Sequence, residues 1–417
     1  MQNSKKLLGI DVGKSHRYHV NEYVSMETNW SKAMAVAGFR AFSLLGSELA
    51  FFALVFREKA QGATFVSFIM FAASLAYFAL APLAGWIADR FSTRQIIPTT
   101  SILQAVLIFT LLFTHNHGLI FLIVFGTAIC SSIEQPTFSA ITPTLSNKED
   151  LARVIGVNQV IYGIAGFLGP ALGGFLVSQT GFIFPFVLDS FSFLVLACSP
   201  FLLRVNRVNL QVVQGEKVKV SDGAKTIVHS RYLLALLILM CTVLLSLGVM
   251  QVGYLYLLTD ILGASATIYG VSGAAFAIGM LLGGGFLSRH PIQRQHHPKY
   301  IFISIVVLAL SISLLSLAWH WSVVVLIDFL SGLTVSIFDV LMEAAFLKTS
   351  SEVYGRVVSA QGAAMNLSML ISLSIAGPLI HALGVRHALF TAGIFALISV
   401  SLTGRRILSV RLDTKEI

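Results

Sequence analysis

The sequence predicts an all-α polytopic membrane protein with twelve transmembrane helices in two six-helix bundles. The first observation is composition: 417 residues are 56% hydrophobic and only 11% charged, with a mean hydropathy of +0.83, whereas a water-soluble chain is about a quarter charged. The second is that the apolar stretches run for roughly 20 residues or more, enough to cross about 30 Å of hydrocarbon as helices. The third is that the longest polar stretch, 204–231, divides these stretches into two sets of six.

Each span follows from one apolar stretch. The first six define an N-terminal bundle over 32–203 and are expected at 33–56, 63–87, 96–114, 118–141, 154–178 and 181–203. The second six define a C-terminal bundle over 232–403 and are expected at 232–257, 267–288, 300–319, 321–346, 357–380 and 385–403. The other segments are an N-terminal tail (1–31) without signal-peptide features, a central loop (204–231) and a C-terminal tail (404–417).

The basic residues predict the orientation in the membrane. Of the 28 Lys and Arg, three fall in loops on one side (Arg57, Lys59 and Arg386), Arg40 falls within a span, and all others lie on the opposite side or in the tails. The basic side of a membrane protein faces the cytoplasm. We therefore expect both termini in the cytoplasm of a bacterial cell, with the chain in its cytoplasmic (inner) membrane. The net charge of +9 then reflects topology and anionic lipid rather than nucleic-acid binding.

Other chemistries find little support in the sequence. Cys130, Cys198 and Cys241 fall in separate spans, which favours neither a disulfide framework nor a zinc site. The stretch GIDVGKS at 9–15 has one residue too few for a phosphate-binding loop and lacks the strand-then-helix pattern around it. We expect no enzymatic activity, no metal and no cofactor. Without an ATPase domain, any pumping has to draw on an ion gradient.

The two halves also repeat each other weakly. A carboxylate after Ser-Ile recurs as Glu134 and Asp339, and the pair Gly169-Pro170 recurs as Gly377-Pro378, roughly half the chain apart. Paired halves of this kind are typical of secondary transporters, whose substrate site lies between the repeats near the bilayer midplane. The repeat therefore predicts a transporter.

Two motifs carry a resemblance to a known family. GWIADRFSTR (85–94) resembles the signature loop of the major facilitator superfamily at Gly85, Asp89, Arg90 and Arg94, although Ser92 replaces a glycine and Thr93 a basic residue. GPALGG (169–174) is similar to the antiporter motif of the fifth span. DSFSF (189–193) and GRV (355–357) resemble a bacterial branch of macrolide-efflux and enterobactin-exporter-like proteins. The resemblance extends from about 32 to 403.

This resemblance implies the major facilitator fold and an exporter. Asp89 and Arg90 would then latch the two halves in one state, whereas the plainer alternative is a charged loop that only sets topology. Gly169, Pro170, Gly173 and Gly174 would form a face with few side chains that packs against the eighth span, where GMLLGGG (279–285) is the expected counterpart. Small residues permit close contact between membrane helices, so ordinary packing is the alternative.

Charged residues within the spans are the candidate substrate and proton sites. Each costs about 3 kcal/mol to insert, so such residues usually face a cavity. The candidates are Arg40, Glu48, Glu134, Asp189, Asp328 and Asp339. Asp328, Asp339 and Glu343 are expected to form a carboxylate stripe along one helix face. Alternatives stay open: Arg40 as a counter-ion or an anion binder, Asp189 as a structural group, Glu134, Asp339 and Glu343 as charges beside a gate.

The sequence thus predicts a secondary exporter of a small amphipathic molecule, either a siderophore or a drug-like compound, working by alternating access and proton antiport. Its expected partners are that molecule, protons and the lipid bilayer, with the protein acting as a monomer. The alternatives are uptake of a nutrient or anion, and a membrane sensor or assembly partner that transports nothing.

Overall fold

The computed structural model describes residues 28–147, 149–204, 220–289, 292, 296–346 and 351–408. Within them the chain is helical and contains no strand. The N-terminal half consists of α1 (Trp30–Glu58), α2 (Ala63–Arg90), α3 (Thr93–Thr110), α4 (His117–Leu145), α5 (Leu151–Thr180) and α6 (Ile183–Leu202). The C-terminal half consists of α8 (Arg231–Tyr256), α9 (Ala266–Arg289), α10 (His297–Leu315), α11 (Trp321–Phe346), α12 (Ser351–Leu383) and α13 (Val385–Leu408). Shorter elements are α7 (Val220–His229), η2 (Lys59–Gln61) and a π-helical turn, η3 (Leu257–Ile261).

These twelve long helices match the twelve expected segments, with ends that differ by a few residues. Eleven of the described helices are long and apolar enough to cross a membrane by length and composition. The twelfth, α3, is not among them; its 18 residues include Arg94, Gln95 and Gln104. It packs against α4 and α6 inside the N-terminal half. Gln104 is buried there and donates to Ser131 of α4, whereas Arg94 and Gln95 are exposed at the start of the helix. The prediction of an all-α polytopic membrane protein is confirmed.

The packing repeats from one half to the other. In each half the first helix packs against the fifth and sixth, the second against the fourth, and the third against the fourth and sixth. The pairs are α1 with α5 and α6, α2 with α4, and α3 with α4 and α6, matched by α8 with α12 and α13, α9 with α11, and α10 with α11 and α13. The weak sequence repeat therefore reflects two structurally equivalent bundles.

Two equivalent seams join the halves. The fifth helix of each half lies on the beginning of the second helix of the other, α5 on α9 and α12 on α2. A side chain at Gly174 would collide with the carbonyl of Ala266, and one at Gly377 would collide with the backbone of Thr64. Glycine at these two positions is what lets the backbones approach so closely.

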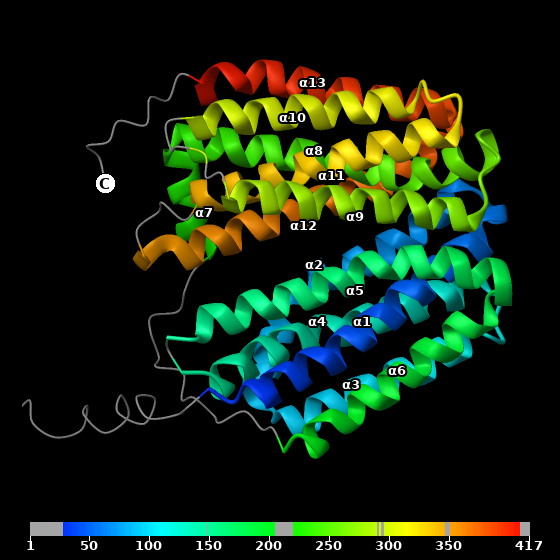
Figure 1. Cartoon of the computed structure of the whole chain (residues 1–417), viewed down its shortest axis with the longest axis vertical. Helices are drawn as coiled ribbons and strands as arrows, with labels where there is room; N and C mark the ends of the chain where they lie inside the picture. The colour runs from blue at the N-terminus through cyan, green and yellow to red at the C-terminus, as the bar shows by residue number, and fades with distance from the viewer. Residues whose placement is uncertain are drawn as a thin grey trace, which may run out of the picture.

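The halves meet at one side of the molecule. We call the side on which α1 begins and α13 ends the terminal side, and the side of η2 and η3 the distal side. Figure 1 shows the two sets of helices together at the distal side and standing apart toward the terminal side. A buried apolar cluster joins the halves distally; it includes Val55, Val66, Val252 and Leu373.

The distal arginines cap helix ends in an equivalent way. The guanidinium of Arg57 donates to the carbonyl of Leu111 at the end of α3, at 2.6 Å. The guanidinium of Arg386 donates to the carbonyls of Ser316 and Ala318, just after α10, at 2.6 and 2.7 Å. The last carbonyls of a helix lack partners and carry partial negative charge. Both arginines thus stabilise the third helix of a half.

Candidate functional site: a polar cavity in the N-terminal half

A cavity of about 500 Å³ lies within the N-terminal half. Its walls come from α1, α2, α3, α4 and α6, and Gln251 of α8 is the one lining residue from the other half. The polar lining side chains that matter most are Arg40, Glu48, Gln104, Glu134, Gln135 and Asp189. Four of the six charged residues predicted as site candidates therefore converge here.

Glu48 is the carboxylate that the fold leaves unsatisfied. It lies on α1, is half-buried, and has no hydrogen-bond or ion-pair partner among the described residues. A side chain at Gly169 of α5 would collide with the β-carbon of Glu48, so α5 and α1 pack closely together at this point. An unpaired charge within a membrane-spanning helix is unfavourable. Glu48 therefore stays a candidate substrate or proton site.

Glu134 and Asp189, in contrast, are buried and hydrogen-bonded. Glu134 of α4 accepts from the hydroxyls of Thr100 and Ser101 on α3, at 2.6 and 3.0 Å. Asp189 of α6 accepts from Ser47 of α1 and Ser192, both at 3.3 Å. These carboxylates tie neighbouring helices of the half together while still lining the cavity. A structural role was one of the alternatives for Asp189, and the two serine hydroxyls are partners that fit such a role.

Arg40 lies two turns from Glu48 along α1 and does not pair with it. Its guanidinium carbon lies 4.6 Å from the ring centre of Tyr162 and 5.1 Å from that of Phe138. Stacking on aromatic faces stabilises the cation through the ring quadrupoles. No described acceptor takes the N–H groups of Arg40. The cavity thus contains an arginine held by rings rather than by a counter-ion.

Gln104 of α3 has one unsatisfied atom. Its amide nitrogen donates to the carbonyl of Thr127 at 3.3 Å and to the hydroxyl of Ser131 at 2.9 Å. A carbonyl only accepts, so these bonds fix which end of the amide is nitrogen. The side-chain oxygen of this fully buried residue has no donor among the described residues. A buried acceptor without a donor costs about 1–3 kcal/mol.

The carboxylates of α11 lie elsewhere. Asp328 is buried in the C-terminal half, where it accepts from the hydroxyls of Tyr254 and Ser272, and it does not line the described cavity. Asp339 is exposed. The expected stripe therefore does not form one surface, because α9 and α8 cover Asp328 while the helix leaves Asp339 uncovered. The side chain of Glu343 lies outside the described residues.

An aromatic layer closes the distal side beyond Glu48. Phe52 and Phe56 of α1 stack at 4.4 Å, and Tyr269 of α9 packs edge-on against both, at 5.3 and 5.4 Å between ring centres. Tyr269 also contacts Tyr254, at 5.2 Å. Aromatic rings in this arrangement exclude water and attract each other. The layer joins α1 to α8 and α9 of the other half, and its rings do not line the described cavity, whose nearby α1 residues are Phe51 and Leu54.

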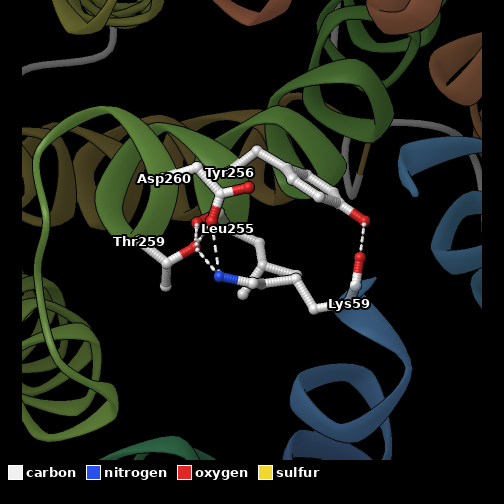
Figure 2. Close-up of polar contacts among 5 residues, drawn as sticks. All are labelled: Lys59, Leu255, Tyr256, Thr259 and Asp260. Atoms are coloured by element: carbon white, nitrogen blue, oxygen red, sulfur yellow. Dashed lines mark hydrogen bonds and ion pairs between the residues drawn. The ribbon is translucent and has the colours of Figure 1, made fainter. Parts of the chain in front are cut away.

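A polar layer follows at the distal surface. Figure 2 shows the ammonium of Lys59 pointing at Asp260 and Thr259, while the Lys59 carbonyl faces the hydroxyl of Tyr256. Lys59 forms an ion pair with Asp260 and donates to Thr259 at 2.9 Å, and Tyr256 donates to the Lys59 carbonyl at 3.0 Å. Lys59 of η2 thus contacts two residues of η3 and also Tyr256 at the end of α8, and these contacts join the two halves.

The signature-loop residues lie at the terminal end of α2 and the start of α3. Asp89, Arg90 and Arg94 are exposed, and the Arg90 guanidinium stacks on Trp86 at 5.3 Å. Gly85 has no described atom within 4 Å of where a side chain would begin, so it makes no close helix contact in this conformation. A latch through Asp89 stays a prediction.

The glycine face of α5 has two partners rather than one. Gly169 and Gly173 face Glu48 and Phe52 of α1, and only Gly174 faces α9. The contact with the eighth span is made at Ala266 and Gly270, the latter lying against the backbone of Pro170 and Ala171.

The prediction that the GMLLGGG stretch of α9 packs against α5 is wrong. Gly279 and Gly283, within the GMLLGGG stretch, lie against the backbone of Phe329 and Leu333 on α11. The reason is that only the distal start of α9 reaches α5. Farther along, α9 stays within its own half.

Several residues of the site are not identified by sequence reasoning. Gln104 and Gln251 are uncharged and sit among many polar residues in spans, so no pattern singles them out. Asp260 becomes visible only through Lys59, its partner from the other half. The sequence does contain one signal for the distal contacts. Three basic residues lie on the side that otherwise lacks them, and each has a specific structural partner: Arg57, Lys59 and Arg386.

Fold and site together define a class: a helical membrane protein with two equivalent six-helix halves and a polar cavity that opens toward their contact is a secondary transporter. The sequence profile described as Major Facilitator Superfamily matches residues 36–327. The chain belongs to the major facilitator superfamily, and it is a transporter rather than an enzyme.

Curated relatives are distant but nearly full-length. The chain is 23% identical over 381 residues to macrolide efflux protein A of Streptococcus pyogenes, covering 88% of this chain and 93% of the relative. It is 23% identical over 411 residues to the MFS-type transporter YfiS of Bacillus subtilis, covering 94% and 93%. Of these two relatives, only the first is named for efflux.

Solved structures confirm the fold. A bacterial homologue of the human lysosomal transporter Spinster, in an inward-facing and unoccupied conformation, superposes with a TM-score of 0.73 at 13% identity, covering 92% of this chain and 98% of the other. The nucleoside transporter NupG superposes with a TM-score of 0.71 at 13% identity, covering 91% and 99%. At such identities the likeness concerns the fold alone.

Proposed function

We propose that the protein exports a small amphipathic molecule, drug-like or siderophore-like, across the bacterial cytoplasmic membrane by alternating access coupled to proton antiport. The observation that carries the proposal is the polar cavity with the carboxylate of Glu48, which has no hydrogen-bond or ion-pair partner among the described residues. Apolar walls suit an amphipathic body, and the polar groups supply orientation. The macrolide-efflux relatives support export.

The orientation follows from the charge distribution. Basic residues such as Arg90 and Arg94 gather on the terminal side, and the distal exceptions are held by specific partners. We therefore place the terminal side, with both chain termini, in the cytoplasm. The described conformation then corresponds to a transporter closed toward the outside. We expect the protein to act as a monomer, because each monomer contains both halves and a whole cavity.

Glu48 is the proposed proton site. A carboxyl group with apolar neighbours and no counter-ion can alternate between a proton and another partner, and each partner must favour a different state for a gradient to drive transport. Glu134 and Asp189 are weaker candidates because hydroxyls already satisfy them. The signature-loop residues Asp89 and Arg90 are proposed to act in gating at the cytoplasmic side.

Uptake is the second candidate function. NupG, a nucleoside transporter, shares the fold, and Arg40 has free N–H donors that could hold an anion. A role without transport, as a sensor or assembly partner, gives no reason for a polar cavity lined by Arg40 and Glu48 within a bundle of membrane-spanning helices.

Transport by the purified protein tests these alternatives. The protein is reconstituted in vesicles with an imposed proton gradient, and uptake of labelled erythromycin and labelled enterobactin is measured in inside-out orientation. Accumulation of either compound that collapses with a protonophore supports proton-coupled export. Movement only in the opposite direction favours uptake, and no movement of any compound in a broader panel contradicts a transport function.

A further inference from the structure

We propose that the cavity recognises a protonated amine that also carries a separate hydrogen-bond acceptor, with the ammonium at Glu48 and the acceptor at Arg40. The inference rests on the proposed transport function for its biological meaning, but it concerns binding alone. It commits to one class among amphipathic molecules and excludes anionic siderophores.

The one unsatisfied carboxyl group of the cavity favours a ligand that donates hydrogen bonds. Glu48, Glu134 and Asp189 all line the cavity. Hydroxyl donors already occupy Glu134 and Asp189. Glu48 alone has no donor among the described residues, so its free oxygens select a ligand that donates. An ammonium group supplies both the charge and the N–H donors for a strong charge-assisted bond.

A second, independent atom points the same way. The side-chain oxygen of Gln104, in the deep wall of the same cavity, is buried without a donor. Such an acceptor is expensive to leave unpaired, and because it is fully buried a ligand N–H would reach it only after neighbouring side chains shift. The unsatisfied groups of the deep cavity are thus both acceptors, one on α1 and one on α3.

Arg40 sets the second requirement. Its guanidinium is stacked on Tyr162 and Phe138, which hold the cation in place but use none of its N–H donors. These donors are free to bind a carbonyl, sulfonyl or hydroxyl oxygen of a ligand. Eight residues of helix separate Arg40 from Glu48, a rise of about 12 Å. Arg40 lies toward the terminal side, from which a ligand would enter.

The order along α1 therefore matches an extended ligand. From the terminal side inward along α1 come Arg40 and then Glu48, and beyond them the cavity is lined by apolar residues such as Leu54 and Leu111. A ligand enters with its amine first and keeps its acceptor near the mouth. An anion would meet Glu48 and be repelled.

Binding to matched fluorescent ligands tests the proposal without any transport. The full-length protein in lipid nanodiscs is titrated with dansyl sulfonamides that share an octyl chain and end in an amine, a hydroxyl or a carboxylate. A fourth ligand keeps the naphthalene, the octyl chain and the amine but lacks the sulfonyl group. The variants are Glu48→Gln and Arg40→Gln, with exposed residues Glu149→Gln and Arg289→Gln as matched controls.

The expected order of affinity for the wild type is amine, then hydroxyl, then carboxylate. Glu48→Gln should weaken the amine about tenfold or more and leave the hydroxyl nearly unchanged, because only the amine loses a charge-assisted bond. Arg40→Gln should weaken the ligand with a sulfonyl group but not the one without it. The controls should change nothing.

Opposite outcomes would overturn the inference. Tightest binding of the carboxylate ligand, or no binding of any ligand, removes the amine as the recognised class. Equal losses for amine and hydroxyl in Glu48→Gln would show that Glu48 only shapes the cavity. In Arg40→Gln, equal losses of affinity for the ligands with and without the sulfonyl group would show that Arg40 does not bind the acceptor. Because no gradient is involved, binding that succeeds while vesicle transport fails would separate this inference from the proposed function.

Discussion

Glu48 and Asp328 are both carboxylates in long membrane helices, and their neighbours give them different tasks. Glu48 faces a cavity and receives no hydrogen bond from a described residue. Asp328, in contrast, is buried and accepts from Tyr254 and Ser272. The sequence places both deep in apolar spans and cannot separate them. What separates them is the set of hydroxyl groups that other helices bring within reach.

We expect Glu48→Gln to abolish gradient-driven accumulation, while downhill exchange continues at substrate concentrations raised to offset the weaker binding, because the proton site is lost but the other walls of the cavity remain. Asp328→Asn should retain coupling and lower stability by about 1–3 kcal/mol through its disturbed hydroxyl network. Vesicle transport with and without a proton gradient measures the first, and thermal unfolding in detergent the second. Coupling that survives in Glu48→Gln and disappears in Asp328→Asn would reverse this assignment.

At the scale of single elements, α5 explains why a membrane helix contains four glycines and a proline within GFLGPALGGFL. Gly169 and Gly173 let α1 lie against α5, and Gly174 lets the start of α9 do so. The helix is continuous through Pro170. Small residues here bring two helices from different halves onto one helix.

Gly173→Leu should therefore open the distal side. The first side-chain carbon would stand 3.1 Å from Phe52, and a leucine would displace this ring from Phe56 and Tyr269. Overpacking of this kind costs typically about 1–3 kcal/mol, which shifts the balance of states roughly tenfold or more. Gly166→Leu is the matched control, because no described atom lies within 4 Å of its added carbon. Cysteine labelling from each membrane side reports the shift, and identical patterns in both variants would contradict it.

The polar contact between η2 and η3 is weaker and more exposed than the packing of α5 against α1 and α9. The side chains of Lys59 and Asp260 are 27% and 48% exposed, and exposed ion pairs contribute about 0.2–1 kcal/mol. We expect Lys59→Asp to raise distal accessibility by at most about fivefold, and addition of Asp260→Lys to restore it. Distances between spin labels on the two halves measure the effect. A loss that the double exchange fails to repair would mean that the charges themselves do not hold the contact.

At the scale of the molecule, much of the architecture follows from the sequence because membrane insertion constrains it so strongly. Apolar length sets the helices, lysine and arginine set the sides, and Gly377-Pro378 repeats Gly169-Pro170 in the equivalent helix. Contacts between halves do not follow, since their partners lie far apart along the chain. Lys59 with Asp260 and Gly174 with Ala266 are examples. One sequence contains no signal that pairs them.

The two equivalent seams predict how the whole molecule moves. Alternating access requires the halves to separate distally, so the α5–α9 seam must open in every cycle. Thr267 donates to Ser178 across this seam at 3.1 Å between side-chain oxygens, which places the two positions close enough for a disulfide after small adjustments. In a background without Cys130, Cys198 and Cys241, we expect Ser178→Cys combined with Thr267→Cys to stop transport on oxidation. Ligand binding from the terminal side should continue, because the cavity is formed in this state. Reduction should restore transport, and each single variant should transport with or without oxidant. Full transport by completely cross-linked protein would show that the seam stays closed throughout the cycle, and the distal side would then have to open elsewhere.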